Sequence, residues 1–250
     1  MNQNSGNLAG KVALVTGASR SMGAAIAKRL AADGATVAIT YSSSPAKAEE
    51  VVRAIETAGG KARAIQADAA DEKAVRAAVT ETVAAFGGLD ILVNNAGTLA
   101  IAPIEQFKME DFDKLIAVNV RGLFVATQEA SKHLRDGGRI IQIGSGGADR
   151  VPFAGGSVYA LTKGAVAAFT KGLARDLGPR RITVNNVQPG PVDTDMNPAR
   201  GEFAEGLKSL MALKRYGTAD EIAGFVAYLA SPEAGYITGA SLTIDGGFAA

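Results

Sequence analysis

The residues best suited to chemistry lie in the segment Ser157–Lys163, where Tyr159 and Lys163 are four positions apart. In a helix this spacing places a phenol and an ammonium on the same face. A free tyrosine has a pKa of about 10 and is a poor acid or base at neutral pH. A nearby lysine charge favours the phenolate, and we expect it to lower the pKa of Tyr159 toward the working range. Ser145 follows the apolar run Arg139–Ile143 and would present a hydroxyl at the end of a strand.

A Tyr–Lys pair at this spacing also occurs by chance in many helices, usually as a solvated pair. Three further segments accompany it here, namely a glycine-rich turn, an Asn-Asn-Ala-Gly run and a Pro-Gly turn. They lie at Thr16–Gly23, Asn94–Gly97 and Pro189–Gly190. Their order and spacing favour a site that holds a cofactor beside the phenol.

The composition of the 250-residue chain narrows the possible classes of function. A formal net charge of +1 offers no basic surface, so we expect no nucleic-acid partner. The absence of cysteine excludes disulfides, thiolate catalysis and cysteine-bound metals. The polar start Met1–Asn7 lacks the apolar core of a signal peptide, and no run approaches the roughly 20 apolar residues of a membrane span. We therefore expect a cytoplasmic protein without a membrane partner.

Short apolar runs alternate with longer segments of helical periodicity along the chain. This alternation is typical of βαβ units, and right-handed crossovers favour a doubly wound parallel sheet with helices on both faces. We expect one α/β domain over residues 1–250 with about seven strands, and a substrate cap at about 190–216. The predicted strands are 11–15, 36–40, 62–66, 91–93, 139–143, 183–187 and 241–244; the predicted helices are 22–33, 45–58, 71–86, about 110–134 and one carrying Tyr159 and Lys163.

The glycine-rich turn Thr16–Gly23 lies between the first predicted strand and the first predicted helix. Backbone N–H groups and a helix N-terminus can receive a pyrophosphate at such a place. Gly17 would permit the sharp exit from the strand, and Gly23 would permit close approach of the backbone to a ligand. The spacing differs from the common G-x-G-x-x-G fingerprint, and by itself the turn is equally compatible with a tight connection.

Taken together, these motifs resemble those of the short-chain dehydrogenase/reductase family, over about Leu8 to Gly247. That family carries T-G-x-x-x-G-x-G, N-N-A-G, a helix asparagine, a serine, Y-x-x-x-K and a P-G turn. The sequence departs from the pattern at Ser21, which stands where the family has its middle glycine. A serine there needs a tolerable backbone conformation, and its hydroxyl could donate to a phosphate. The resemblance implies a Rossmann-like fold and a nicotinamide cofactor.

The end of the second strand bears on the choice of cofactor. NAD-binding proteins place an Asp or Glu there to hold the ribose 2′-hydroxyl. Here the strand runs into Tyr41, Ser42 and Ser43, with no carboxylate before Glu49. In the resembled family a basic residue at the position of Arg20 accompanies NADP, although Arg20 could equally be a solvated surface arginine. The sequence therefore favours NADP(H), with NAD(H) the less favoured cofactor.

The resemblance also implies a cofactor-binding set that follows five of the predicted strands and includes Tyr159 and Lys163 of the later helix. Asp68 would bond the adenine amino group, or it could instead be the N-cap of a loop or helix. Asn94 and Gly97 would steady the central strand and line the ribose side, unless they form only a structural turn. A rigid turn would likewise explain Pro189 and Gly190 without a ligand. The set comprises Gly17, Ser19, Arg20, Ser21, Met22, Gly23, Tyr41, Ser42, Ser43, Asp68, Asn95, Ala96, Gly97, Tyr159, Lys163, Pro189, Gly190, Val192 and Thr194.

The catalytic set implied by the resemblance is Asn119, Ser145, Tyr159 and Lys163. Tyr159 would give a proton to the oxygen of a carbonyl that receives hydride, and its phenolate would remove the proton in the reverse direction. Ser145 would polarise that oxygen, and Lys163 would also bond the ribose hydroxyls. Asn119 would hold a water in a proton relay behind Lys163; the alternative is a helix asparagine satisfied by its neighbours.

Other residues carry weaker signals. His133, the only histidine, precedes Gly137-Gly138 near a predicted helix end, so capping or surface packing is the better interpretation. Asp193 and Asp195 could mimic a metal pair, but they lack a third ligand nearby, and we predict no metal site. An apolar set with roughly helical spacing is either core-facing or the lining of a substrate pocket. It comprises Met196, Phe203, Leu207, Leu210 and Met211.

The sequence thus predicts an NADPH-dependent reductase acting on a small-molecule ketone or 3-oxoacyl-type carbonyl. The segments 197–217 and 237–247 resemble 3-oxoacyl-carrier-protein reductases or broad carbonyl reductases. One alternative is an NAD(P)-dependent alcohol or sugar dehydrogenase working oxidatively. A second is a non-catalytic protein that senses NADPH, against which the complete catalytic set argues. The resemblance implies a homotetramer built through the long helices and the C-terminal strand.

Overall fold

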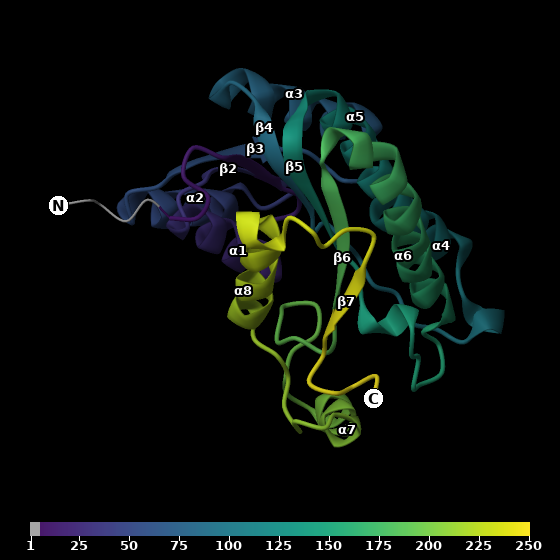
Figure 1. Cartoon of the computed structure of the whole chain (residues 1–250). Coiled ribbons are helices and arrows are strands. Elements are labelled where there is room, and N and C mark those ends of the chain that lie inside the picture. Colours follow the sequence, from purple (N-terminus) through teal and green to yellow (C-terminus); the bar gives the residue numbers. More distant parts are fainter. Residues whose placement is uncertain (1–5) are drawn as a thin grey trace.

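The computed structural model describes residues 6–250, and the first five residues of the polar stretch Met1–Asn7 lie outside the described part. A seven-stranded sheet forms the middle layer, with the order β3-β2-β1-β4-β5-β6-β7 (Figure 1). All its pairings are parallel, which confirms the doubly wound sheet predicted from the sequence. The strands are β1 Val12–Val15, β2 Thr36–Tyr41, β3 Lys61–Gln66, β4 Leu89–Asn94, β5 Leu134–Ile143, β6 Thr183–Pro189 and β7 Ser241–Ile244.

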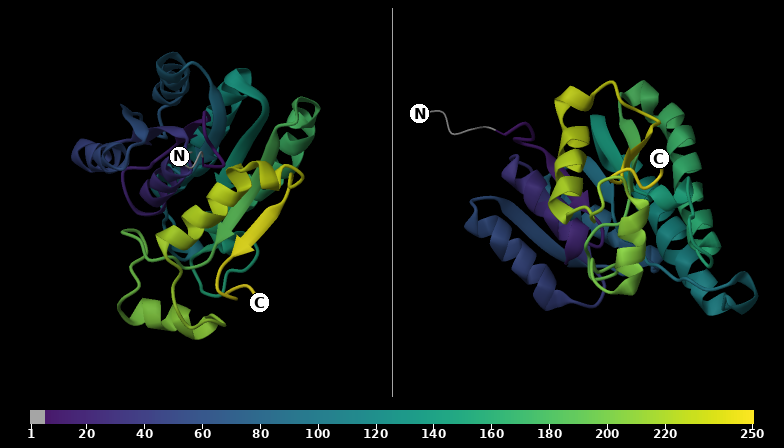
Figure 2. Two further views of the ribbon diagram at one scale, coloured as in Figure 1. Left: turned by 60° about the vertical axis from the view of Figure 1, so that its left-hand side comes forward. Right: turned by 90° about the horizontal axis from the view of Figure 1, so that it is seen from below.

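Helices cover both faces of the sheet (Figures 1 and 2). One core packs α1, α2 and α8 against residues such as Val15, Ile39 and Val93. The other packs α3, α5 and α6 against the alternate strand positions, including Leu14 and Leu92. The helices are α1 Ser21–Ala32, α2 Pro45–Thr57, α3 Glu72–Phe86, α4 Met109–Ile116, α5 Leu123–His133, α6 Ser157–Leu177, α7 Glu202–Leu210 and α8 Ala219–Ala230, with short 3-10 turns at 104–106, 146–148, 178–180 and 232–234.

Burial on both faces explains why the central strands are continuous apolar runs. Every residue of β1 and β4 is buried, because helices lie over each side of the sheet. The order of the strands reverses between β1 and β4. From β1 the sheet continues to β2 and β3, and from β4 it continues in the other direction to β5. In doubly wound folds a ligand crevice lies outside the carboxyl ends of the strands at this reversal.

Three features differ from the elements predicted by the sequence. The long helix predicted at about 110–134 is interrupted by a π-helical turn, Ala117–Gly122, between α4 and α5. β5 begins at Leu134, directly after α5, rather than at Arg139. The sequence analysis assigned no element to residues 217–240, where the structure has α8. A capping box, in which Thr218 and Glu221 bond each other's backbone N–H, begins that helix.

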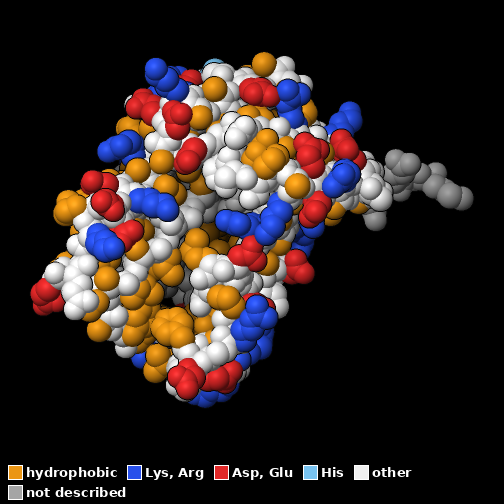
Figure 3. All heavy atoms as spheres, turned by 180° about the vertical axis from the view of Figure 1, so that it is seen from behind, with side chains coloured by type: hydrophobic (Ala, Val, Ile, Leu, Met, Phe, Trp, Pro, Cys, Tyr) orange, Lys and Arg blue, Asp and Glu red, His pale blue; other side chains and the backbone are white. Residues whose placement is uncertain are grey.

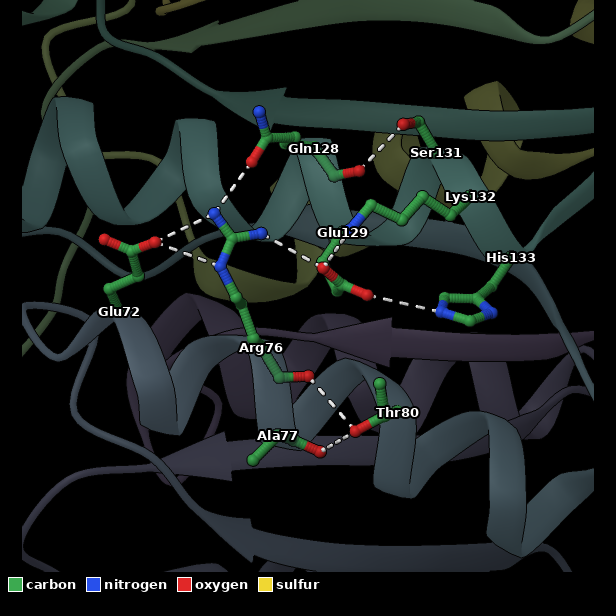
Figure 4. A network of polar contacts seen from close by, with 9 residues as sticks. All are labelled: Glu72, Arg76, Ala77, Thr80, Gln128, Glu129, Ser131, Lys132 and His133. Carbon is green, nitrogen blue, oxygen red and sulfur yellow. Dashed lines mark hydrogen bonds and ion pairs between the residues drawn. The ribbon is translucent and has the colours of Figure 1, made fainter.

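A buried carboxylate fastens α5 to α3 (Figure 4). Glu129 is only 7% exposed, and it accepts hydrogen bonds from Lys132 at 2.7 Å and from Arg76 of α3 at 3.0 Å. These bonds, the one from Lys132 foremost, lower the pKa of Glu129 against the opposing effect of burial. His133 Nε2 lies 3.4 Å from the same carboxylate, so the single histidine belongs to this network at the end of α5.

Among residues 6–250, no helix has both the length and the apolar character needed to cross a bilayer.

Candidate active site

The four predicted catalytic residues come together beside the carboxyl end of β5. Ser145 follows that strand, and Tyr159 and Lys163 lie on successive turns of α6. Lys163 Nζ donates to the carbonyl oxygen of Ile143, the last residue of β5, at 2.9 Å. Asn119 reaches α6 through a bond from its Nδ2 to Thr162 Oγ1 at 3.2 Å. The i, i+4 spacing read in the sequence thus becomes a common face turned toward the strand end.

Burial governs the acid–base properties of Tyr159 and Lys163. It raises the pKa of Tyr159, and the Ser145 side chain partly opposes this effect. It lowers the pKa of Lys163 from 10.5 to about 8, since the ammonium is almost fully removed from water. Lys163 Nζ lies 5.7 Å from the centre of the Tyr159 ring and bonds a carbonyl rather than the phenol oxygen. The expectation that Lys163 lowers the pKa of Tyr159 is therefore wrong for this arrangement, because desolvation dominates and raises that pKa.

Both polar atoms of the Asn119 side chain form hydrogen bonds with neighbouring residues. Its amide oxygen accepts from Thr98 N at 2.8 Å, and its amide nitrogen donates to Thr98 O at 2.9 Å. The residue is 1% exposed and lies within the π-helical turn. Such turns often occur at functional sites. The side chain ties the loop after β4 to α6, so a water held at Asn119 would have to use its main-chain carbonyl.

The two glycines of the first turn are required by close packing. Gly17 has a φ of +62°, and a Cβ on it would lie 2.8 Å from Ala96 Cα. A Cβ on Gly23 would lie 2.5 Å from the amide nitrogen of Asn95, which itself donates to Gly17 O at 3.0 Å. Asn95 and Ala96 thus lock the glycine turn onto the end of β4. Helix α1, which follows, has no side-chain hydrogen bond at its N-cap, Arg20.

Ser21 occupies the backbone conformation that the family glycine would adopt. Its φ is +50°, in the left-handed region that most L-residues avoid. Its hydroxyl accepts a hydrogen bond from Asp195 N at 3.3 Å. The glycine-rich turn is thereby joined to the segment after β6, and Ser19 and Met22 on either side are half-buried.

The residues predicted to read the adenosine half lie at the ends of β2 and β3. Ser42 and Ser43 are exposed and Tyr41 is partly buried. Asp68 is exposed, and its carboxylate accepts from Ala70 N at 2.9 Å, as expected for a turn residue. Arg20 is not simply solvated, because its Nε lies 3.8 Å from a carboxylate oxygen of Asp195.

The segment after β6 forms the far wall of the site. A Cβ on Gly190 would lie 2.7 Å from Asp245 Cα, so the Pro189–Gly190 turn packs directly against the chain that follows β7. Val192 is buried and bridges to Gly217. Thr194 closes a small turn with Asn197 through reciprocal backbone hydrogen bonds of 3.2 and 3.3 Å.

An open cleft of about 940 Å³ lies between these walls, and both Ser145 and Tyr159 line it. Figure 3 shows hydrophobic side chains gathered around a hollow toward the end of the molecule where Figure 1 places α7. Of the apolar set noted in the sequence, Met196, Phe203 and Leu207 line the cleft, while Leu210 and Met211 do not. The remaining apolar lining includes Met22, Leu99, Ile101, Val151, Pro152, Phe153, Pro191, Val192 and Phe248.

No motif in the sequence singled out Arg150, the only charged side chain that lines this cleft in the described chain. Its guanidinium donates to the carbonyl oxygens of Phe248 and Ala250 and lies 5.9 Å from the centre of the Phe248 ring. Phe248 in turn packs with Leu207 and Met211 of the cap. Arg150 therefore fixes an apolar wall of the cleft through contacts about 100 residues away in the sequence.

The two aspartates of the cap have protein partners. Asp193 accepts from Ala199 N at 2.9 Å, and Asp195 pairs with Lys47 at 3.4 Å. Within residues 6–250, no group of three or more His, Cys, Asp or Glu side chains has an arrangement suited to a metal ion.

Known proteins share both the sequence and the fold of this chain. The family model described as enoyl-(acyl carrier protein) reductase matches residues 17–249. The cyclic-di-GMP-binding biofilm dispersal mediator protein of Escherichia coli is 46% identical over 98% of this chain and 100% of its own length. A Serratia marcescens short-chain dehydrogenase/reductase is 63% identical with a TM-score of 0.97, over 98% of this chain and 100% of that one. A Burkholderia cenocepacia short-chain dehydrogenase in complex with NADP is 56% identical with a TM-score of 0.96, with the same coverage. The chain belongs to the short-chain dehydrogenase/reductases, a family of NAD(P)-dependent oxidoreductases that act on carbonyl and alcohol groups.

Proposed function

We propose that this oxidoreductase uses NADPH to reduce a ketone or 3-oxoacyl-type carbonyl to a secondary alcohol, with Tyr159 as the proton donor. The observation that carries the proposal is that the hydroxyl-bearing side chains of Ser145 and Tyr159 line one predominantly apolar cleft. A carbonyl oxygen placed between them would meet two hydroxyl groups, while apolar walls surround the rest of the substrate.

The roles of the residues follow from the charge that develops during reduction. NADPH, when bound, supplies the hydride that the carbonyl carbon receives. Ser145 then donates a hydrogen bond to the oxygen as negative charge grows on it, an oxyanion-type interaction. Tyr159 transfers its phenolic proton to the same oxygen, and burial keeps the phenol protonated beforehand by raising its pKa. Lys163 lies behind Tyr159 on the same helix. Its pKa of about 8 is close to neutral, so it can give or take up a proton during the reaction.

The cofactor residues predicted from the sequence remain the best candidates for holding NADP(H). The first turn of α1 has no side-chain cap, which leaves its N–H groups for a pyrophosphate. Arg20 could supply positive charge to a 2′-phosphate, and the exposed serines Ser42 and Ser43 could supply hydroxyl donors. The NADP complex of the Burkholderia relative supports NADP(H) over NAD(H).

The walls of the cleft favour bulky apolar substrates. Phe153 and Phe203 meet edge to face, with ring centroids 5.7 Å apart, and Phe248 is held in place by Arg150. Such a surface gains affinity from buried apolar area rather than from charge. We therefore infer that a neutral aromatic or long-chain ketone is reduced faster than a small hydrophilic one.

The proton-donor role is tested by Tyr159→Phe. We expect the variant to bind NADPH as the parent does and to lose turnover of a ketone by a factor of about 10² to 10⁴. Tyr228→Phe, an exposed tyrosine of α8, is the matched control and should leave turnover unchanged. Ketone reduction that survived in Tyr159→Phe would show that another group donates the proton.

A second function has a specific observation in its favour. The E. coli relative is named as a cyclic-di-GMP-binding mediator, which supports a ligand-sensing role in which NADPH binds without turnover. Titration of the wild type with cyclic di-GMP, with and without NADPH, separates the two. Binding together with an absence of reduction across a panel of ketones would favour the sensor. An oxidative alcohol or sugar dehydrogenase would instead show NAD(P)⁺-dependent turnover of alcohols.

We also propose a homotetramer assembled through the long helices and the C-terminal strand, in the cytoplasm. The exposed Phe124 on α5 supports a covered helix face. β7 is an edge strand of the sheet, with one neighbour in the chain, and so offers a second surface for assembly.

A further inference from the structure

Two cations from different connections converge on one carboxylate oxygen of the cap. Arg20 lies in the β1–α1 turn and Lys47 in the first turn of α2. Both approach Asp195 Oδ2, Arg20 Nε at 3.8 Å and Lys47 Nζ at 3.4 Å. Asp195 comes from the segment after β6, so these contacts span the mouth of the site.

The backbone holds Asp195 at the same place. Its N–H donates to Ser21 Oγ at 3.3 Å, so both its main chain and its side chain bind the connections that follow β1 and β2. The side chains of Arg20, Lys47 and Asp195 are each between 51% and 58% exposed. Ion pairs this exposed are weak, because water and salt screen them. Asp195 is therefore an occupant that a stronger anion can displace.

A phosphate monoester is such an anion. It carries about −1.5 to −2 charge at pH 7 and three acceptor oxygens, against the single charge of a carboxylate. An arginine can bind two of its oxygens at once, while a lysine adds a point charge. Ser42 and Ser43, both exposed just before α2, can donate to the third. The surroundings of Asp195 thus match a monoester better than they match a carboxylate.

We propose that Lys47 adds a second positive charge to the 2′-phosphate site that the family resemblance already implies at Arg20, and that Asp195 is a built-in competitor for that site. Arrival of the phosphate would break both ion pairs of Asp195 and leave the cap joined to the glycine turn by the Ser21 hydrogen bond. Lys47 then adds selectivity for NADPH over NADH, and Asp195 links occupation of the phosphate site to the tethering of the cap. The inference rests on the proposed use of NADPH, but its test needs no turnover.

The test is a calorimetric titration with adenosine 2′,5′-bisphosphate and, as the ligand without the 2′-phosphate, adenosine 5′-monophosphate. Lys47→Ala should weaken binding of the bisphosphate about tenfold, since a charge-assisted contact is lost. Asp195→Asn removes the competing charge and keeps the shape, and it should tighten binding about three- to fivefold. Neither change should alter the affinity for the monophosphate. The control is Lys61→Ala, which changes an exposed lysine at the first residue of β3, the amino end of that strand. It should change neither affinity.

The outcomes separate this inference from the proposed function. Unchanged bisphosphate affinity in Lys47→Ala, or weaker binding in Asp195→Asn, would overturn the inference while leaving NADPH-dependent reduction intact. Equal effects on both nucleotides would also overturn it, because the 2′-phosphate would then not be what Lys47 reads. The proposed function fails by a different route, namely survival of ketone reduction in Tyr159→Phe.

Discussion

We expect the buried ammonium of Lys163 to make cofactor binding sensitive to pH. Burial lowers its pKa to about 8, so in the free protein the charge is lost as the pH rises through 8. Bound NADPH brings negative charge and ribose acceptors, which favour the ammonium and raise its pKa. Binding should therefore take up a proton above pH 8, and the dissociation constant should rise between pH 8 and 9.5 while staying level below about 7.5. Fluorescence titrations across this range measure it.

The matched variant for this prediction is Lys163→Arg. Arginine keeps its charge throughout the range, so the slope between pH 8 and 9.5 should disappear. A level profile in the wild type would show instead that the ammonium gains nothing from the cofactor.

Ser21 stores backbone strain at the head of α1. A non-glycine residue in the left-handed region is destabilised by about 1–2 kcal/mol, and the φ of Ser21 is +50°. Ser21→Gly should raise the free energy of unfolding by about 1 kcal/mol, which urea denaturation measures. Ser19→Gly, two residues earlier and without a positive φ, should lower it slightly through the entropy of the unfolded chain. A loss of stability in Ser21→Gly would mean that the hydrogen bond from Asp195 outweighs the strain.

Among the elements, the π-helical turn is the one most tightly constrained by its neighbours. Gly122 ends the turn, and a Cβ there would lie 2.1 Å from the carbonyl oxygen of Ala69, in the loop before α3. Gly122→Ala should therefore destabilise the fold by about 3 kcal/mol, because a backbone atom has to move. Gly172→Ala, in α6 with no atom within 4 Å of the new Cβ, should stabilise it by about 0.5–1 kcal/mol.

Urea denaturation of the two glycine variants checks this contrast directly. Similar stabilities would indicate that the α5 end of the turn shifts freely. If Gly122→Ala is less stable, as expected, Asn119 should be displaced with it, since Asn119 lies in the same turn and accepts a hydrogen bond from Thr98 N at 2.8 Å.

The alternating helices and strands were predicted well, because the spacing of apolar residues in a helix and the apolar run of a buried strand are local properties of the sequence. Helix α8 was not predicted, although Thr218 and Glu221 form the capping box with which this helix begins. The π-helical turn was not predicted either, since one extra residue within a helix leaves the apolar pattern almost unchanged. The pairing of Lys47 with Asp195 joins residues 148 positions apart, and no periodic pattern links them. The pKa of Tyr159 is raised, opposite to the prediction, because the side chain is buried, and a sequence motif does not show burial.

For the whole molecule, the outer faces of α5 and α6 are the features that a monomer leaves unexplained. Phe124 is 45% exposed, and its ring lies 6.0 Å from that of Phe169 on α6. With a net charge of only +1, little electrostatic repulsion opposes association of such faces. Light scattering should therefore give a mass four times the 25.5 kDa of the chain. A wild type that runs as a monomer would make the homotetramer prediction wrong.

Phe124→Glu tests which surface carries the assembly. A carboxylate in a packed helix face is strongly disfavoured unless it is paired, so the particle should fall to half its mass, because β7 still holds the remaining contact. Ile104→Glu, which changes an equally apolar side chain that is 64% exposed in a separate 3-10 turn, should leave the mass unchanged. If both variants dissociate, the helices are not a specific interface. If only Phe124→Glu does, α5 is covered in the assembled protein, and the exposed apolar area there is explained by a second copy of the chain.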